Sequence, residues 1–258
     1  MISEILSLLG RAYPIRRGRW TLSRHFRRWC HGCAITRLRC GAAMLVDRYN
    51  MVDRVIYLFG DYDHEEMEWM ISKIRDPRQT LLCDIGANIG AYSVILPTLV
   101  PGLEVHAFEP DLRNLTFLRA NVCINGLEER VAICDKAVGA EAGTVEFLEY
   151  RGGDSLNTGK SRVVTESEGQ PGVRTVARIT LDDHAEWSGR TILMKIDVEG
   201  YELDVLSGMR RTLRDNDCFL MIEIFAGNIA RCDALMAELG YQRTKAFGSD
   251  DWAYEKKS

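Results

Sequence analysis

Residues 81–93 read LLCDIGANIGAYS, and this stretch decides the fold. Three apolar residues lead into Asp84, and two glycines and an asparagine follow within the next six positions, at Gly86, Asn88 and Gly90. An apolar run that ends in glycines is typical of a buried strand followed by a tight turn and a helix. The free N–H groups at the start of such a helix can bind an anionic group, so the stretch predicts a ligand site.

The rest of the chain repeats this alternation of strand and helix. From residue 80 onward, short apolar runs are followed by segments with helical periodicity, and residues 241–256 have the pattern of a terminal hairpin. The Gly/Ser-rich residues 151–172 predict a loop. Alternation of this kind predicts βαβ units, and runs that are apolar throughout indicate helices on both faces of a sheet. We therefore expect an α/β, Rossmann-like fold whose mainly parallel sheet carries an antiparallel C-terminal hairpin.

The residues around the glycine turn discriminate between two classes of nucleotide ligand. A dinucleotide site favours the spacing G-x-G-x-x-G, but Asn88 and Ala91 stand in its second and third positions. Asp84 would repel a pyrophosphate and attract an amine. Glu109 ends the next apolar run, nineteen residues after Gly90, where a carboxylate can accept hydrogen bonds from both hydroxyls of a ribose. S-adenosylmethionine has an amine, a carboxylate and a ribose, and it fits this set.

The third apolar run ends next to Asp135. The tip of that strand should approach the base of the same nucleotide, so Asp135 could accept a hydrogen bond from the adenine amino group. The alternative is a solvated aspartate in a turn, a position that this residue type favours.

Charged residues also follow the later run TILM, in the stretch MKIDVEGYE. The period of a strand places Lys195, Asp197 and Glu199 on one side, beside the expected cofactor. The alternative is a helix N-terminus enriched in acids. Glu223 lies inside the apolar run FLMIEIF, where a lone carboxylate is costly unless it is paired, for example with Lys195. For a general base we expect Asp197 first, Glu199 second, and Glu223 or His184 after them; two neighbouring carboxylates could instead bind a divalent cation, but we expect no metal.

Several of these stretches, in this order, resemble the FkbM-type S-adenosylmethionine-dependent methyltransferases. The resemblance covers about residues 43–240 and rests on DIGANIGAYS, AFEPD, NVCING, KIDVEGYELDVLSG and MIEI. It implies a class I methyltransferase fold and methylation of a hydroxyl oxygen on a sugar, a glycan or glycolipid, or a polyketide-type natural product. It also implies roles for seven residues. The methionine part would be held by Asp84, Gly86, Asn88 and Gly90, the ribose by Glu109, and the reaction centre by Asp197 and Glu199.

The charge of the chain is unevenly distributed. The chain has 258 residues and a net charge of −4, but residues 1–46 hold nine arginines and one glutamate, a balance of +8. We expect these residues to form a helical N-terminal extension and residues 47–258 to form the methyltransferase domain. A basic extension on an acidic body suggests that the extension has a partner of its own.

Arginines and apolar residues alternate in the extension, over residues 11–39. Leu22, Phe26, Trp29 and Cys33 follow helical spacing with arginines between them, which predicts an amphipathic basic helix. Such a helix can lie on an anionic membrane, bind nucleic acid phosphates, or pack on the body of the protein with its arginines reaching solvent.

The cysteines and the N-terminal residues indicate in which cellular compartment the protein is expected. Cys30, Cys33 and Cys40 lack a second ligand pair at zinc-finger spacing, and most of the later cysteines lie inside apolar runs. The N-terminal residues lack the pattern of a secretory signal peptide. We therefore expect a cytoplasmic protein, with the inner membrane surface as a contact for residues 11–39.

The sequence leaves three functions open. The first is an O-methyltransferase for a hydroxylated, sugar-containing acceptor. The second is an RNA methyltransferase recruited by the arginine-rich extension, and the third is a nucleotide-binding membrane adaptor without catalysis.

Overall fold

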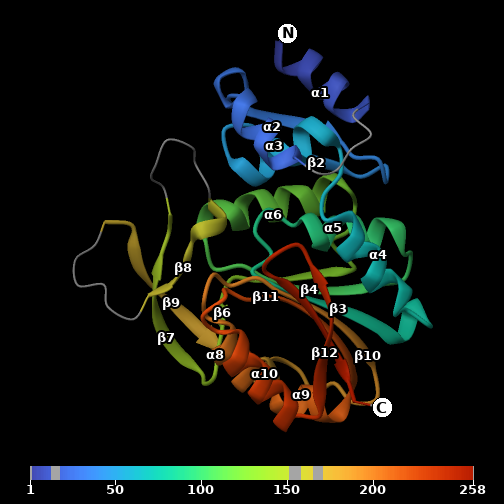
Figure 1. Ribbon diagram of the computed structural model, residues 1–258, viewed down its shortest axis with the longest axis vertical. Coiled ribbons are helices and arrows are strands. Elements are labelled where there is room, and N and C mark those ends of the chain that lie inside the picture. Colours follow the sequence, from blue (N-terminus) through green and yellow to red (C-terminus); the bar gives the residue numbers. More distant parts are fainter. Residues whose placement is uncertain (1, 13–17, 151–157, 165–170, 258) are drawn as a thin grey trace.

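The computed structural model describes residues 2–12, 18–150, 158–164 and 171–257, and a seven-stranded sheet forms its centre (Figure 1). The strand order is β12–β13–β11–β10–β3–β4–β5, and only β13 runs antiparallel to its neighbours. The strands are β3 (Thr80–Ile85), β4 (Glu104–Phe108), β5 (Val131–Cys134), β10 (Thr191–Ile196), β11 (Asp217–Glu223), β12 (Tyr241–Phe247) and β13 (Asp251–Lys256). This is the expected α/β Rossmann-like architecture, and the antiparallel C-terminal hairpin is confirmed.

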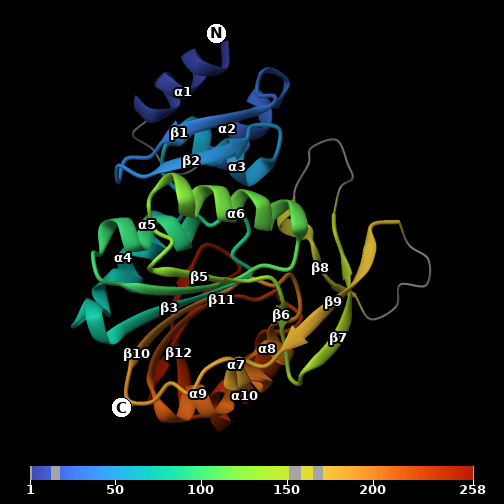
Figure 2. The same ribbon diagram turned by 180° about the vertical axis from the view of Figure 1, so that it is seen from behind.

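Helices cover both faces of this sheet (Figure 2). One face carries α4 (His64–Ser72), α5 (Ala91–Leu99) and α6 (Leu112–Ile124); the other carries α7 (Leu181–His184), α8 (Glu202–Ser207), α9 (Arg210–Asp215) and α10 (Ile229–Glu238). Successive residues of β3 point to opposite faces, so Leu82 packs into one hydrophobic cluster while Leu81 and Cys83 pack into the other. Two buried faces explain why the strands read as continuous apolar runs.

The strand order places the ends of β3 and β10 side by side. From β3 the chain builds the sheet outward through β4 and β5, and it then returns to add β10 and β11 on the other side. Ile196 pairs with Ile85, and the N–H of Asp197 donates to the carbonyl of Ile85 at 3.0 Å. Ligands of open α/β sheets bind at this kind of reversal, beyond the carboxyl ends of the strands.

A second sheet lies between β5 and β10 in the chain. It has the order β6–β9–β7–β8 and consists of β6 (Ala137–Val138), β7 (Gly143–Leu148), β8 (Arg162–Val164) and β9 (Val173–Ile179). The loop that we predict at residues 151–172 lies in part outside the described residues. Within it, Thr158–Lys160 form a 3-10 turn and Arg162–Val164 form β8.

The N-terminal segment is only partly helical. It begins with α1 (Ile2–Ala12), α2 (Arg19–Phe26) and a 3-10 turn (Arg27–Trp29), but it continues as an antiparallel ribbon of β1 (Cys33–Arg37) and β2 (Ala43–Asp47). The expectation of a helix that reaches Cys33 is therefore wrong. Helical geometry ends at Trp29, because Cys30 is already extended, and the β-branched Ile35 and Thr36 suit a strand.

The N-terminal segment shares its core with the central sheet. It packs on α3 (Met51–Phe59), and β2 packs on α6. Cys30, Met44 and Val46 belong to the same hydrophobic cluster as Leu82 and Val105. The boundary that we expect after residue 46 falls inside β2. No helix of the described residues combines the length and apolar character needed to cross a membrane.

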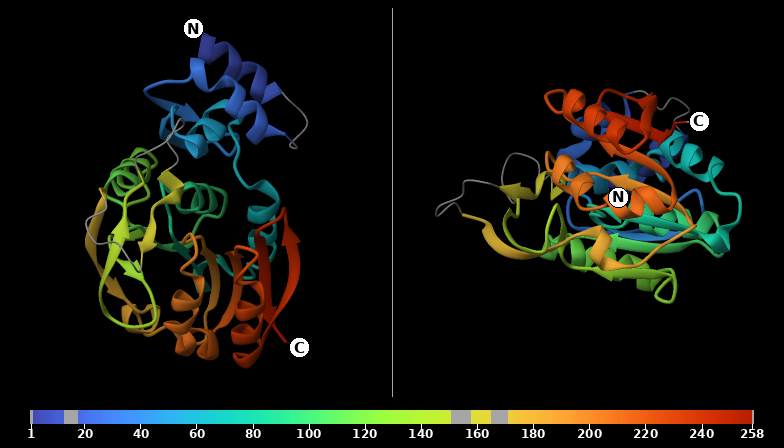
Figure 3. Two further views of the ribbon diagram at one scale, coloured as in Figure 1. Left: turned by 60° about the vertical axis from the view of Figure 1, so that its left-hand side comes forward. Right: turned by 90° about the horizontal axis from the view of Figure 1, so that it is seen from below.

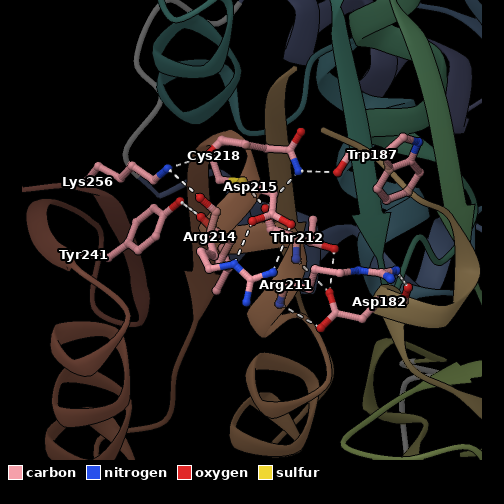
Figure 4. A network of polar contacts seen from close by, with 11 residues as sticks. Asp182, Trp187, Arg211, Thr212, Arg214, Asp215, Cys218, Tyr241 and Lys256 are labelled. Carbon is pink, nitrogen blue, oxygen red and sulfur yellow. Dashed lines mark hydrogen bonds and ion pairs between the residues drawn. The ribbon is translucent and has the colours of Figure 1, made fainter. Parts of the chain in front are cut away.

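A polar network surrounds α9 and joins it to neighbouring segments (Figure 4). The carboxylate of Asp182, from α7, accepts hydrogen bonds from the N–H groups of Arg211 and Thr212 and from the Thr212 hydroxyl, at 2.7–2.8 Å. The Tyr241 hydroxyl donates to the carbonyl of Leu213 at 2.9 Å. Side chains from α7 and β12 thus satisfy backbone groups at both ends of α9.

We expect Asp182→Ala to lower the free energy of unfolding by about 1–3 kcal/mol, because the substitution removes an acceptor for three donors at a helix start. Urea unfolding monitored by circular dichroism measures this loss. The affinity for S-adenosylhomocysteine should stay within about threefold of wild type, because Asp182 lies outside the lining of the large cleft at the carboxyl ends of the strands. An unchanged unfolding midpoint would contradict the role given to Asp182.

Candidate active site

A cleft of about 610 Å³ opens at the carboxyl ends of β3, β4, β10 and β11. Eight carboxylates line it: Asp63, Glu66, Glu109, Asp197, Glu199, Glu223, Asp250 and Asp251. A wall this rich in acids disfavours pyrophosphate and favours a cationic ligand.

The glycine turn after β3 lets two strand tips meet. Gly86 lines the cleft with φ +84, and a Cβ at this position would overlap the carbonyl oxygen of Asp197. Only glycine therefore allows the end of β10 to pack against the turn. Gly90 also has a positive φ, but a Cβ there would lie 2.5 Å from the side chain of Leu118. Gly90 therefore allows α5 to pack closely on α6.

Glu109 and Asn88 are held together at the tip of β4. The carboxylate of Glu109 accepts hydrogen bonds from the N–H groups of Asn88 and Asp111, both at 2.7 Å. Burial raises the pKa of Glu109 to about 8, and its side chain is 4% exposed. Asn88 has φ +53, and its buried Oδ1 has no hydrogen-bond partner in the described part of the chain. Asn88 itself lines the cleft beside Glu109.

Asp84 lies behind the cleft wall. It is 2% exposed, and its Oδ2 accepts hydrogen bonds from the N–H and hydroxyl of Ser93 at 3.1 and 2.6 Å. Burial raises its pKa to about 6. Asp84 therefore fixes the first turn of α5 against β3, and the structure does not bring it into the cleft lining.

Asp135 is also outside the cleft. Its carboxylate is 57% exposed and lies 3.8 Å from Arg119, which corresponds to the turn alternative. The neighbouring Lys136 lines the cleft instead.

Asp197, Glu223 and Lys195 form the polar centre of the site. Burial raises the pKa of Glu223 to about 10, and repulsion by Asp197 together with a hydrogen bond to that residue adds to the shift. The carboxyl groups of Glu223 and Asp197 thus favour a state in which the pair holds one proton. Lys195 is 4% exposed, and its Nζ lies 2.8 Å from Asp251 and 4.0 Å from Asp197. Burial opposes the charge of Lys195, but Asp251 and Asp197 outweigh burial and raise its pKa.

Glu199 lies two residues beyond Asp197, on the same cleft. It adopts φ +53, a left-handed conformation that is costly for a residue with a side chain. Burial and the charge of Asp197 raise its pKa to about 7. The structure thus brings together four predicted site residues from β10, β11 and the turn after β10: Lys195, Asp197, Glu199 and Glu223.

Sequence reasoning missed Asp63, which lies just before α4. It has φ +35, accepts a hydrogen bond from the Tyr92 hydroxyl at 3.2 Å, and lines the cleft near Lys195. Burial raises its pKa to about 7. The signal available in the sequence was the acidic stretch GDYDHEE at residues 60–66, which carries no apolar periodicity.

His184, a further candidate for the general base, lies outside the cleft lining. Its Nε2 is 3.1 Å from Nδ1 of His106, and its ring contacts Phe108 and Trp187. Burial lowers its pKa. His184 packs with other rings outside the cleft lining and is not placed to act as the base.

The cysteines of the N-terminal segment have different surroundings. Cys30 is fully buried, Cys33 is exposed and Cys40 is half-buried. No group of three His, Cys, Asp or Glu side chains among the described residues is arranged to hold a metal ion.

The raised pKa of Glu223 gives a pH-dependent prediction for stability. Between its ordinary pKa and about 10 the folded state binds more protons than the unfolded state, so stability falls as pH rises. Glu223→Gln removes this titration. The free energy of unfolding of Glu223→Gln, taken relative to that of wild type at the same pH, should therefore rise by about 2–4 kcal/mol between pH 6 and pH 9. Urea unfolding of both proteins at the two pH values measures the difference, and parallel pH profiles would contradict the assignment.

Comparisons with known proteins agree with this geometry. Residues 84–243 match the model of the methyltransferase FkbM domain. A hexuronic acid methyltransferase, AglP of Haloferax volcanii, is 30% identical over 147 residues, which make up 57% of this chain and 56% of that protein. The chain thus spans little more than half the length of this relative.

Solved methyltransferase structures are similar at a distance. The precorrin-6y C5,15-methyltransferase of Geobacter metallireducens has a TM-score of 0.43 and 14% identity, covering 75% of this chain and 88% of its own. TYW2 of M. jannaschii, solved with AdoMet, has a TM-score of 0.41 and 13% identity, covering 88% of each chain. The family match extends over more than half of the residues and includes the turn at Gly86 and the centre at Asp197 and Glu223. The chain belongs to the FkbM methyltransferase domain family, and its mainly parallel sheet has the Rossmann-like order.

Proposed function

We propose that the protein is an S-adenosylmethionine-dependent O-methyltransferase whose acceptor is a hydroxyl of a sugar, a glycan or glycolipid, or a natural product. One observation carries this proposal. A single cleft contains both Glu109, at the strand end where a carboxylate can bind ribose, and the carboxyl pair of Asp197 and Glu223, which is suited to proton transfer.

The residues of the cleft fit the cofactor. The N–H groups of Asn88 and Asp111 aim the carboxylate of Glu109, which suits two ribose hydroxyls. The unpartnered Oδ1 of Asn88 is an acceptor for a donor such as an ammonium group, and Gly86 leaves room for close approach. Of the residues that we predicted for the cofactor, Gly86, Asn88 and Glu109 would contact it, and Asp84 and Gly90 would support the turn. Asp135 would not contact the adenine.

S-adenosylmethionine, when bound, supplies an electrophilic methyl group on a positively charged sulfur. The chain's own residues would prepare the acceptor oxygen. Holding two reactants in line can contribute roughly 7–11 kcal/mol, so orientation by the cleft is the larger effect. Asp197 would accept the proton of the acceptor hydroxyl, which contributes about 100- to 10,000-fold. Glu223 would hold Asp197 in position as a hydrogen-bond donor, and Lys195 would balance the negative charge.

The sugar acceptor is favoured over RNA. The relative from Haloferax volcanii is described as acting on hexuronic acid, and the acidic cleft would repel a polynucleotide. An RNA methyltransferase recruited by the N-terminal arginines is the second candidate. Membership of a methyltransferase family disfavours the non-catalytic adaptor. The cytoplasmic location and the contact of residues 11–39 with an anionic membrane stay predictions.

Incubation with methyl-labelled S-adenosylmethionine and separate polysaccharide, glycolipid and RNA extracts tests the proposal. We expect label in a carbohydrate-containing fraction, and the label should resist mild base as a methyl ether does. Label in RNA alone would replace the sugar acceptor by the second candidate. Label in none of the fractions, together with no binding of S-adenosylhomocysteine, would overturn the proposed function.

A further inference from the structure

The N-terminal segment contributes to the wall of the catalytic cleft. Trp20 and Arg24, both on α2, line the same cleft as Asp197. They are four residues apart on a helix, so they lie on one face, one above the other. In Figure 3, left, the N-terminal segment (blue) lies above the central sheet, and the small sheet that carries Arg162 lies to one side.

Arg24 carries a charge that no described residue pairs. Within the described residues its guanidinium makes no hydrogen bond or ion pair, although eight carboxylates line the same cleft. Other arginines of the segment are engaged: Arg19 lies 3.4 Å from Asp61, and Arg11 donates to the carbonyl of Arg37 at 2.6 Å. Arg162, on the wall formed by β8, donates to the carbonyl of Lys160 at 3.3 Å, and its charge partly offsets the rise in the pKa of Glu199. Among the described residues, the guanidinium of Arg24 thus lies unpaired at a cleft whose floor is acidic.

Arg54 fixes α2 in this position. It is fully buried, and its Nε donates to the carbonyl and the hydroxyl of Ser23 at 2.9 and 3.1 Å. Its Nη1 donates to the carbonyl of Tyr49 at 2.8 Å, which ties α2 to the start of α3. Ser23 lies between Trp20 and Arg24, so Arg54 positions the face that both side chains present. A surface that is held in place loses little freedom when it binds a ligand.

We propose that Trp20 and Arg24 form an acceptor subsite that selects a sugar carrying a carboxylate, a hexuronate. This inference rests on the proposed methyltransferase function and names its substrate class. The exposed indole of Trp20 offers a flat apolar face for the C–H side of a sugar ring. The planar guanidinium of Arg24 offers paired donors for a carboxylate.

The charge pattern favours a single carboxylate over a chain of phosphates. A hexuronate can direct its one charge to the arginine on the wall while its uncharged hydroxyls enter the acidic floor near Asp197. A polynucleotide brings a charge at every residue and would meet the acidic side chains of the floor directly.

A matched pair of probes tests the subsite. Para-nitrophenyl β-glucuronide and para-nitrophenyl β-glucoside differ only by a carboxylate in place of a hydroxymethyl group. With S-adenosylhomocysteine present, ligand-observed NMR titration should show the glucuronide binding about tenfold more tightly to wild type. Arg24→Gln should remove this preference, and Trp20→Ala should weaken the binding of both probes.

Arg28→Gln is the control, because it removes the same charge from the same segment at a residue outside the cleft lining, where Arg28 lies 4.0 Å from the ring of Trp29. It should keep the preference for the glucuronide. Equal affinities of wild type for the two probes, no binding of either, or an equal loss in Arg28→Gln would overturn the subsite. The affinity for S-adenosylhomocysteine, measured on the same samples, reports on the proposed function separately and should be unchanged in Arg24→Gln.

Discussion

Replacing Asp197 with asparagine should lower the rate of methyl transfer by about 100- to 10,000-fold and leave the affinity for S-adenosylhomocysteine within about threefold of wild type. Asparagine has the shape of aspartate but cannot accept the proton of the acceptor hydroxyl. Its side-chain oxygen can still accept the hydrogen bond from Glu223, so the centre should keep its geometry. Single-turnover transfer of labelled methyl to the fraction that wild type labels measures the rate.

Two further variants control this result. Glu199→Gln tests the second candidate for the base and should cost less than Asp197→Asn. Asp135→Asn removes an exposed carboxylate outside the cleft and should behave as wild type. Full activity of Asp197→Asn, or a larger loss in Glu199→Gln, would move the role of the base away from Asp197.

Replacing Glu109 with glutamine should weaken the binding of S-adenosylhomocysteine by about 100-fold or more, because an amide has one acceptor atom where a carboxylate has two, and its NH₂ group opposes a donor. The backbone adds to the effect. Both carboxylate oxygens of Glu109 accept N–H groups, from Asn88 and Asp111, so an amide must turn one NH₂ group toward a donor. Calorimetric titration measures the affinity, and unfolding curves check that the variant is folded.

The two substitutions should separate binding from chemistry. Asp197→Asn should bind S-adenosylhomocysteine without turnover, whereas Glu109→Gln should lose binding first and transfer methyl slowly at low cofactor concentration. Equal affinities of wild type and Glu109→Gln would remove Glu109 from the ribose site.

The sequence predicted the strand tips well because local patterns determine them. Residues 81–93 form β3, the glycine turn and the start of α5 as expected, since apolar residues and glycines constrain the backbone directly. Period-2 spacing also predicted that Lys195, Asp197 and Glu199 lie on one side, and the cost of a lone carboxylate suggested that Glu223 pairs with Lys195. These side chains do meet, because β10 and β11 are parallel neighbours and end at one edge.

Other parts of the site depend on contacts between segments distant in the chain. Asp63 enters the cleft through a turn before α4, and its partners Tyr92 and Lys195 come from α5 and β10. Asp135 follows the last residue of β5 and turns outward, a one-residue difference that strand periodicity does not define. No motif in the sequence predicts that Trp20 and Arg24 reach the cleft, because buried Arg54 and Ser23 determine that placement.

The structure of the protein crystallised with S-adenosylhomocysteine tests the central claim most directly. We predict that the ribose hydroxyls contact the carboxylate of Glu109, that the amino acid end lies against the turn at Gly86 and Asn88, and that the sulfur faces Asp197. A nucleoside bound anywhere else, including the cavity lined by Arg39 and Met67 between the N-terminal segment and α4, would contradict the account.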